Sequence, residues 1–186
     1  MPYIDVDENL PGIRALMAFS PETAEPMGAL ANLLLRSDEG LGKADRELIA
    51  AHVSYLNDCF YCHQSHGEIA TCYLDGNRDL VNKVKTDYEN APISNKLKSL
   101  LSIAASVQKG GKHVRPDQIQ YTKALGATDK EIHDTVLIAA LFCMFNRYVD
   151  GLASNTPADL STYPPRAKQV AEHGYGKHVF SASQPK

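Results

Sequence analysis

The stretch Glu47-Leu-Ile-Ala-Ala-His-Val-Ser-Tyr-Leu-Asn-Asp-Cys-Phe-Tyr-Cys-His-Gln-Ser-His66 decides how this chain folds. Apolar helical segments stand on both sides of Asn57-Asp58, and these two residues are good helix N-caps. The pattern predicts one helix over about 44–56 and a second that begins at or beside Cys59 and ends near Asp75. A bend at Asn57-Asp58 would let the second helix fold back along the first.

The remainder of the chain is also helical in pattern. Ser20-Pro21 reads as an N-cap followed by proline at the first helical position, and Thr128-Asp-Lys-Glu131 reads as a capping box. Further helices are expected over about 20–36, 77–88, 95–108, 116–126, 132–152 and 166–173. Strand-like alternation is scarce, so we predict one all-α domain over residues 1–186, with its core chemistry in about 43–75 and a second helical half in about 94–153.

The composition of the chain limits the kinds of molecule that we expect it to bind. The chain has 186 residues and a formal net charge of −3, so it carries no basic signature of nucleic-acid or anionic-membrane binding. No apolar run approaches the ~20 residues of a membrane span. Residues 1–10 contain three acidic side chains and no cationic or apolar leader pattern. We therefore expect a cytoplasmic protein that binds neither nucleic acid nor membrane.

The residues that carry chemistry are two closely spaced cysteines and a histidine. Each helical residue advances about 100° around the axis, which puts Cys59, Cys62 and His66 on one face. Glu47 can reach that face only if the chain bends at Asn57-Asp58. The spacing thus predicts a thiol site with a base, and a carboxylate that orients the base.

The start of a helix suits such a site. Unpaired amides and the helix dipole favour an anion there, and a nearby histidine lowers a thiol pKa further. A thiolate that attacks a peroxide becomes a sulfenic acid, which a neighbouring thiol converts to a disulfide. An external dithiol must then reduce that disulfide by exchange.

The same cysteines and histidines are compatible with other roles. The cysteines could be core residues, as we expect for Cys72 and Cys143 in their apolar helical contexts. A zinc site could use Cys59, Cys62, His63 and His66, but one helix face cannot surround a tetrahedral ion. The letters C-x-x-C-H match a c-type haem attachment, which normally requires export, and a thioredoxin-like motif would need a βαβ context. We expect no metal and no cofactor.

The pattern Glu47-x11-Cys59-x2-Cys62-x3-His66 resembles the active-site pattern of AhpD-like alkylhydroperoxidases, within the carboxymuconolactone decarboxylase family. Arg46 to Ala50, Asn57, Asn146-Arg147 with Asp150-Gly151, and Gly174-Tyr175 resemble its "peroxidase-related" branch. The similarity spans roughly residues 12–176. It implies an AhpD-like all-α fold and a homo-oligomer, either a dimer, a trimer or a hexamer.

The resemblance also implies roles. Cys62 would attack a small hydroperoxide with His66 as its base, Cys59 would resolve the sulfenic acid, and Glu47 would complete the proton relay. The best-studied members have a histidine between the cysteines, where this chain has Tyr61, and a neutral phenol is a donor rather than a base. His63 and His52 are possible substitutes. The alternative functions are a non-catalytic or zinc-binding redox sensor, and a lyase resembling carboxymuconolactone decarboxylase.

Overall fold

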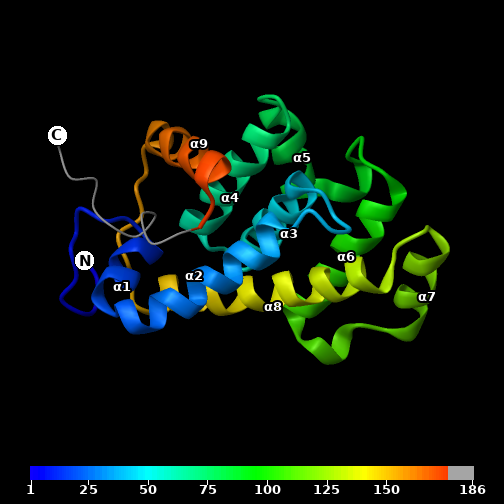
Figure 1. The fold of residues 1–186 in the computed structure, drawn as a ribbon, viewed down its shortest axis with the longest axis horizontal. Coiled ribbons are helices and arrows are strands. Elements are labelled where there is room, and N and C mark those ends of the chain that lie inside the picture. The colour runs from blue at the N-terminus through cyan, green and yellow to red at the C-terminus, as the bar shows by residue number, and fades with distance from the viewer. Residues whose placement is uncertain (176–186) are drawn as a thin grey trace.

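The computed structural model describes residues 1–175, so the last part of the predicted domain, 176–186, lies outside the described residues. Within 1–175 the chain forms nine α-helices and no strand, which confirms the predicted all-α class (Figure 1). The helices are α1 (Ile13–Phe19), α2 (Pro21–Arg36), α3 (Lys43–Leu56), α4 (Phe60–Tyr73), α5 (Arg78–Asp87), α6 (Asn95–Lys109), α7 (Pro116–Ala124), α8 (Asp129–Gly151) and α9 (Tyr163–His173). Single 3-10 turns occur at Tyr88–Asn90, Gly111–His113 and Leu160–Thr162.

Capping residues explain why several of these helices begin where the sequence predicts. The side chains of Asn77 and Ser94 accept hydrogen bonds from backbone amides in the first turns of α5 and α6. At α8, Thr128 accepts from the Glu131 amide at 3.1 Å while the Glu131 carboxylate accepts from the Thr128 amide at 2.8 Å. This is the predicted capping box, and it satisfies two amides that would otherwise lack partners.

Helix α1 is not among the helices predicted from the sequence. Its N-cap is Gly12, which makes no side-chain hydrogen bond, so the sequence has no capping signal at this start. Gly12 has a φ of 58°, a conformation that glycine adopts without steric cost. A Cβ at this position would lie 2.2 Å from the ring of Tyr61. Glycine at position 12 therefore permits both the turn into α1 and the close approach of α1 to α4.

The predicted break at Asn57-Asp58 is present, and it takes the form of a Schellman turn. The Cys59 amide donates to the Ser54 carbonyl at 3.0 Å, and the Asp58 amide donates to the Tyr55 carbonyl at 3.0 Å. Asp58 itself has the left-handed φ of 58° that this motif requires. The turn ends α3 and sends α4 back alongside it, and α3 and α4 pack on each other more extensively than any other pair of described helices.

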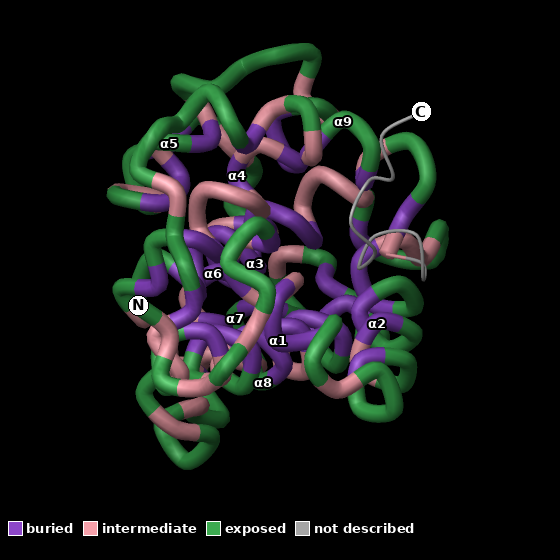
Figure 2. The backbone as a smooth tube through the Cα atoms, turned by 90° about the vertical axis from the view of Figure 1, so that its left-hand side faces the viewer, coloured by how far each residue is buried: buried purple, intermediate pink, exposed green. Residues whose placement is uncertain are grey.

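The core lies where α3, α6 and α8 meet, and the buried backbone segments gather there (Figure 2). Every residue of α3 from Arg46 to Ser54 is buried. By length and composition α8 could cross a membrane, but its apolar residues pack against α3 and α6, which explains its composition as that of a core helix. Helices α4 and α9 form a second contact region beside this core.

A buried ion pair fixes the helix on which Glu47 stands. The fully buried guanidinium of Arg46 donates to Asp134 of α8 at 3.0 Å and to the backbone carbonyl of Leu34 in α2 at 2.7 Å. It also donates to the carbonyl oxygens of Leu41 and Glu39. One side chain thus joins α2, α3 and α8, and holds α3 in register.

Burial of the two remaining cysteines differs from the prediction. Cys72 is exposed, and Cys143 is only partly buried, so the expectation that both are core residues is wrong for Cys72. Cys72 lies in the last turn of α4, where the helix leaves the core. Ala70, two residues earlier and therefore about 200° away around the helix, is buried on the opposite side.

Candidate functional site

The Schellman turn places the two predicted thiols at the start of α4. Cys59 is the N-cap residue and is fully buried, and Cys62 lies in the first helical turn with 4% exposure. The His63 amide donates to the Cys59 carbonyl at 3.0 Å, which closes that first turn. Both cysteines are reduced and lie in one small buried cluster with Tyr61, Val149 and Tyr163.

The fold also brings Glu47 to His66. The Glu47 Oε2 atom lies 2.7 Å from Nδ1 of His66, and the carboxylate is completely buried. Because a carboxylate accepts hydrogen bonds, Nδ1 is the donor, and in a neutral imidazole the lone pair is then on Nε2. Glu47 therefore fixes the tautomer that a proton-accepting histidine needs.

Tyr175 completes this group, although the sequence pattern assigns it no role beyond its place in the family resemblance. Its hydroxyl donates to Glu47 Oε1 at 2.7 Å and lies 3.2 Å from His66 Nδ1. The tyrosine ring stacks on the imidazole with the centroids 6.0 Å apart. Burial of the hydroxyl and the charge of Glu47 raise the pKa of Tyr175 well above its ordinary value, so the phenol stays protonated and acts as a donor.

Hydrogen bonds from two side chains of α2 to the backbone at the end of α9 position Tyr175. The Arg36 guanidinium donates to the carbonyl oxygens of Val170 and Ala171 at 3.0 and 2.6 Å. The Asn32 side-chain oxygen accepts a hydrogen bond from the Tyr175 amide at 3.0 Å. Gly174, which lies between the end of α9 and Tyr175, has a φ of 79°. A Cβ on Gly174 would lie 2.5 Å from the Asn32 oxygen, so glycine is needed for this close approach.

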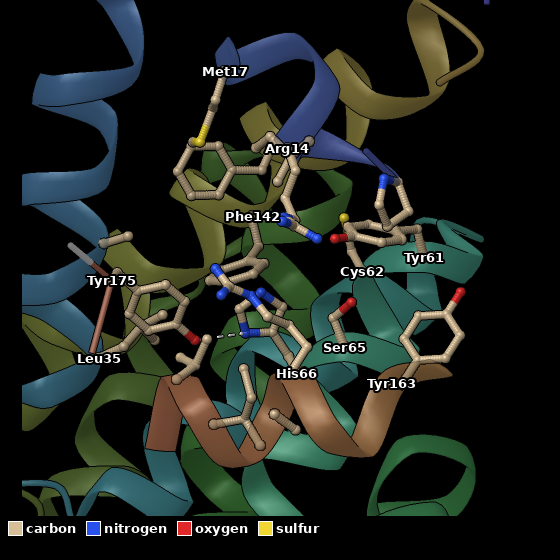
Figure 3. Close-up of a pocket in the computed structure, with 18 of the residues that line it drawn as sticks. Arg14, Met17, Leu35, Tyr61, Cys62, Ser65, His66, Phe142, Tyr163 and Tyr175 are labelled. Carbon is tan, nitrogen blue, oxygen red and sulfur yellow. Dashed lines mark hydrogen bonds between the residues drawn. The ribbon is translucent and has the colours of Figure 1, made fainter. Parts of the chain in front are cut away.

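Cys62 and His66 open onto the same cavity, which Figure 3 shows in close-up. Its volume is about 130 Å³, and it lies between α1, α2, α4, α8 and α9. Most of its wall is apolar, from Met17, Leu35, Ile69, Phe142 and Val170 among others. Cys59 does not line this cavity, so of the two thiols Cys62 is the one that faces it.

The two thiols differ electrostatically as well. A hydrogen bond from the Cys59 thiol to Cys62, together with burial, raises the pKa of Cys59 far above its ordinary value. The expectation that the helix start lowers the pKa of both thiols is therefore wrong for Cys59, which precedes the first helical turn and is fully enclosed. Cys59 is the protonated partner and Cys62 is its acceptor.

Asp150, which the sequence places only within the family resemblance, is a second acceptor near Cys59. Its carboxylate is within hydrogen-bonding reach of the Cys59 thiol, and burial raises the pKa of Asp150. The residue as a whole is exposed at the end of α8. Because a thiol has one proton, Cys59 can donate either to Cys62 or to Asp150, and the second direction leads toward solvent.

Tyr61 has a packing position rather than a place in the Glu47–His66 group. It is buried against Tyr163, with the ring centroids 6.0 Å apart, and against Gly12. Burial and the neighbouring Cys62 raise the pKa of Tyr61 to about 12. The phenol cannot replace a basic histidine at neutral pH, and the hydroxyl that reaches Glu47 comes instead from Tyr175.

The proposed substitutes His63 and His52 lie outside the cavity wall. His63 packs edge-on against Tyr55 and Phe60, and burial followed by the charge of Lys85 lowers its pKa to about 4. His52 contacts the Lys85 carbonyl at 3.2 Å, and burial lowers its pKa too. Among the described residues neither histidine makes a hydrogen bond to Glu47 or a ring contact with His66.

No group of three or more His, Cys, Asp or Glu side chains within residues 1–175 is arranged to hold a metal ion. The four side chains of the alternative zinc reading do not converge. His66 turns to Glu47, while His63 packs between two aromatic rings on another side of α4.

Comparison with known proteins supports the fold and the family. Residues 21–71 match the carboxymuconolactone decarboxylase family, and this segment contains Glu47, Cys59, Cys62 and His66. No protein of curated function matches the chain.

Several solved structures share the fold, among them these three. An uncharacterised peroxidase-related protein from Silicibacter sp. TM1040 is 27% identical with a TM-score of 0.74, over 83% of this chain and 78% of that one. An uncharacterised peroxidase-related protein with an alkylhydroperoxidase AhpD core, from Ralstonia eutropha JMP134, is 26% identical with a TM-score of 0.74, over 81% and 78%. A protein of unknown function from Agrobacterium tumefaciens is 21% identical with a TM-score of 0.68, over 86% and 100%, and this last match shows the fold alone.

Proposed function

We propose that this chain is a thiol-dependent hydroperoxide reductase, because residues 21–71 match the carboxymuconolactone decarboxylase family and the fold is AhpD-like. One observation carries the proposal: Cys62 and His66 face a single apolar cavity, and buried Glu47 fixes the tautomer of His66 from behind. This arrangement suits a nucleophile, a base and an orienting carboxylate.

The first step oxidises Cys62. His66 takes the proton of the Cys62 thiol, and the thiolate attacks the terminal oxygen of the hydroperoxide. The O–O bond breaks, Cys62 becomes a sulfenic acid, and the alkoxide that leaves takes the proton from His66 to become an alcohol. Glu47 and Tyr175 hold the imidazole while its proton arrives and departs.

The second step regenerates a closed pair. Cys59 attacks the Cys62 sulfenic acid, its proton passes to Asp150, and the hydroxide that leaves becomes water on taking up a proton. The product is a Cys59–Cys62 disulfide. An external dithiol reduces it by exchange, so that the net reaction converts a hydroperoxide and a dithiol into an alcohol, water and a disulfide.

The assignment of Cys62 as the attacking thiol is supported by position and charge. Cys62 lines the cavity and accepts a hydrogen bond, whereas Cys59 is fully buried and keeps its proton. The dithiol donor, the oligomeric state and the cytoplasmic location stay predictions, and light scattering of the purified protein measures the second of these.

The test is hydroperoxide consumption against a panel of dithiol reductants, for the wild type and for Cys62→Ser and Cys59→Ser. Turnover should be lost in both variants, and Cys59→Ser should still form one trappable sulfenic acid per chain. Full turnover in Cys62→Ser would contradict the mechanism. Activity on a lactone that needs Glu47 and His66 but neither cysteine would favour a lyase instead, and one bound zinc per chain lost with the thiols would favour a metal-binding sensor.

A further inference from the structure

A second cavity lies on the side of α4 that is turned away from Cys62. Because successive residues are about 100° apart around a helix, Gly67 and Thr71 lie about 140° and 180° around α4 from Cys62. Both line a cavity of about 390 Å³, within the range of about 300–1,000 Å³ that is usual for small-molecule sites. Among the described residues, none that lines this cavity also lines the cavity of Cys62 and His66. It is a separate space, which we call the α4–α5 cavity.

Three parts of the fold enclose the α4–α5 cavity. Helix α4 contacts both α5 and α9, and Figure 1 shows it between them. The turn that leads into α9 contributes Leu160 and Ser161 to the wall. Amide side chains come from α4 and α5, as Gln64 and Asn82. These amides can both donate and accept hydrogen bonds, so the wall suits a polar ligand.

Lys85 of α5 places a buried ammonium group against this cavity. The residue is only 6% exposed, and it lines the cavity together with Gly67. A Cβ on Gly67 would lie 3.4 Å from the Lys85 Nζ atom and 3.5 Å from Val81. Because glycine has no Cβ, the charged end of Lys85 can approach α4 closely at this point. The ammonium group is thus held at the cavity wall.

The ammonium group of Lys85 lacks an acceptor. Among the described residues, Nζ has no hydrogen bond and no carboxylate within ion-pair distance. The charge of Glu68 acts on it, but both oxygens of Glu68 accept hydrogen bonds from Arg78 at 2.7 Å. Burial lowers the pKa of Lys85, and the charge of Glu68 acts in the opposite direction. A buried cation without an acceptor is costly, and a bound anion would supply the acceptor.

The charges of the wall favour a ligand with a single negative charge. Glu68 and Arg78 neutralise each other, so Lys85 leaves the described wall with one excess positive charge. A carboxylate matches that charge. A phosphate monoester carries about −1.5 to −2 at neutral pH and would bring excess negative charge close to Glu68.

We propose that Lys85 anchors a binding site for small polar carboxylates on the far side of the redox helix α4. The ammonium group of Lys85 donates to the carboxylate, and Gln64 and Asn82 form hydrogen bonds with the rest of the ligand. The site is independent of the proposed peroxidase function, since neither cysteine of the pair nor His66 lines it. Its tests need no hydroperoxide, so their failure would leave that function untouched.

Calorimetric titration tests the site with N-acetylglycinate and its neutral analogue N-acetylglycinamide. Wild type should bind the carboxylate about tenfold or more tightly, because a charge-assisted hydrogen bond is stronger than a neutral one. The preference should disappear in Lys85→Met, which keeps an unbranched apolar side chain without the charge. It should persist in Lys83→Met, which removes a charge from a 43% exposed side chain of the same helix. Equal affinities of wild type for the two probes, or an unchanged preference in Lys85→Met, would overturn the site.

Chemical labelling locates the site in the wild-type protein, so it does not depend on whether Lys85→Met folds. The protein is treated briefly with acetic anhydride, and the acetylation of Lys85 and Lys83 is measured by mass spectrometry. N-acetylglycinate should slow the acetylation of Lys85 severalfold and leave that of Lys83 unchanged, whereas N-acetylglycinamide should slow neither. Acetylation of Lys85 at the same rate with and without N-acetylglycinate would contradict the proposal.

An amine without a hydrogen-bond partner could also react with an aldehyde, and the same protein distinguishes this role. The Lys85 nitrogen would add to the carbonyl carbon, and loss of water would leave an imine. Cyanoborohydride would then fix propionaldehyde on Lys85 faster than on Lys83, and wild type would bind the two acetylglycine probes equally. That pair of results would replace the carboxylate site with a reactive amine.

Discussion

Tyr175 is the single residue that most changes the picture of the proton relay. Its hydroxyl gives buried Glu47 a second hydrogen bond, and its ring stacks on His66, so Tyr175 positions both side chains. Tyr175→Phe should lower kcat about tenfold and change the pH profile of kcat, because His66 loses part of its orientation. Tyr148→Phe, which removes a hydroxyl that contacts a backbone carbonyl outside the cavity, is the matched control. Identical pH profiles for Tyr175→Phe and wild type would show that Tyr175 only packs.

Asp150 acts on the other thiol. If it takes the proton of Cys59, then Asp150→Asn should slow the resolving step while leaving the first oxidation fast. The sulfenic acid on Cys62 should then accumulate and be trapped by dimedone, severalfold more than in wild type. Asp58→Asn is the control, since it removes a neighbouring carboxylate at the same helix junction and asparagine tolerates its positive φ. Equal trapping in the two variants would remove Asp150 from the mechanism.

At the scale of the elements, the buried Arg46–Asp134 pair holds α3 against α2 and α8. Arg46→Met should cost about 3–5 kcal/mol of unfolding free energy, because a buried carboxylate loses a partner and several buried carbonyls lose their donor. Urea denaturation measures this. Lys83→Met breaks the exposed Lys83–Asp87 pair and should change stability by less than about 1 kcal/mol. A cost for Arg46→Met as small as that of Lys83→Met would show that α3 is held by apolar packing alone.

The elements also show what the sequence can predict. Helices with a side-chain cap begin close to where the sequence predicts, because the capping residue lies within four residues of the helix start. Examples are the helices after Asn77, Ser94 and Thr128. The bend at Asn57-Asp58 is also predicted from neighbouring residues. The approach of Glu47 to His66 follows from that bend. Helix α1 has only a glycine cap and offers no such signal.

Contacts between distant segments set the limit of that prediction. Tyr175 meets Glu47 across 128 residues, and Arg14 and Arg166 reach one cavity from opposite ends of the chain. No local pattern encodes either arrangement. Tyr61 stands where the best-studied members of the family have a histidine, yet it packs against Tyr163, and the hydroxyl that reaches Glu47 comes from Tyr175 beyond the end of α9. These side chains could be assigned only once the helices were packed.

At the scale of the whole molecule, half-buried histidines make stability depend on pH. The pKa of His63 is about 4 in the folded state against an ordinary 6.5, because burial and Lys85 oppose its charge. Between these values the unfolded chain binds more protons, so the free energy of unfolding should fall as pH drops from about 6.5 to 4. Allowing for the solvent-exposed part of the ring, the loss is on the order of 1 kcal/mol. Urea denaturation at several pH values in this range should show that the free energy of unfolding depends less steeply on pH in His63→Gln than in wild type. The same pH dependence in both proteins would contradict the lowered pKa of His63.

The central claim is that Cys62 and Cys59 act as one redox pair, and a single-turnover experiment tests it most directly. Fully reduced protein is mixed with one equivalent of hydroperoxide, its remaining thiols are alkylated, and its peptides are identified by mass spectrometry. The account predicts the loss of two thiols per hydroperoxide, a Cys59–Cys62 disulfide, and alkylated Cys72 and Cys143. Hydroperoxide consumed without that disulfide, or oxidation confined to exposed Cys72, would contradict it.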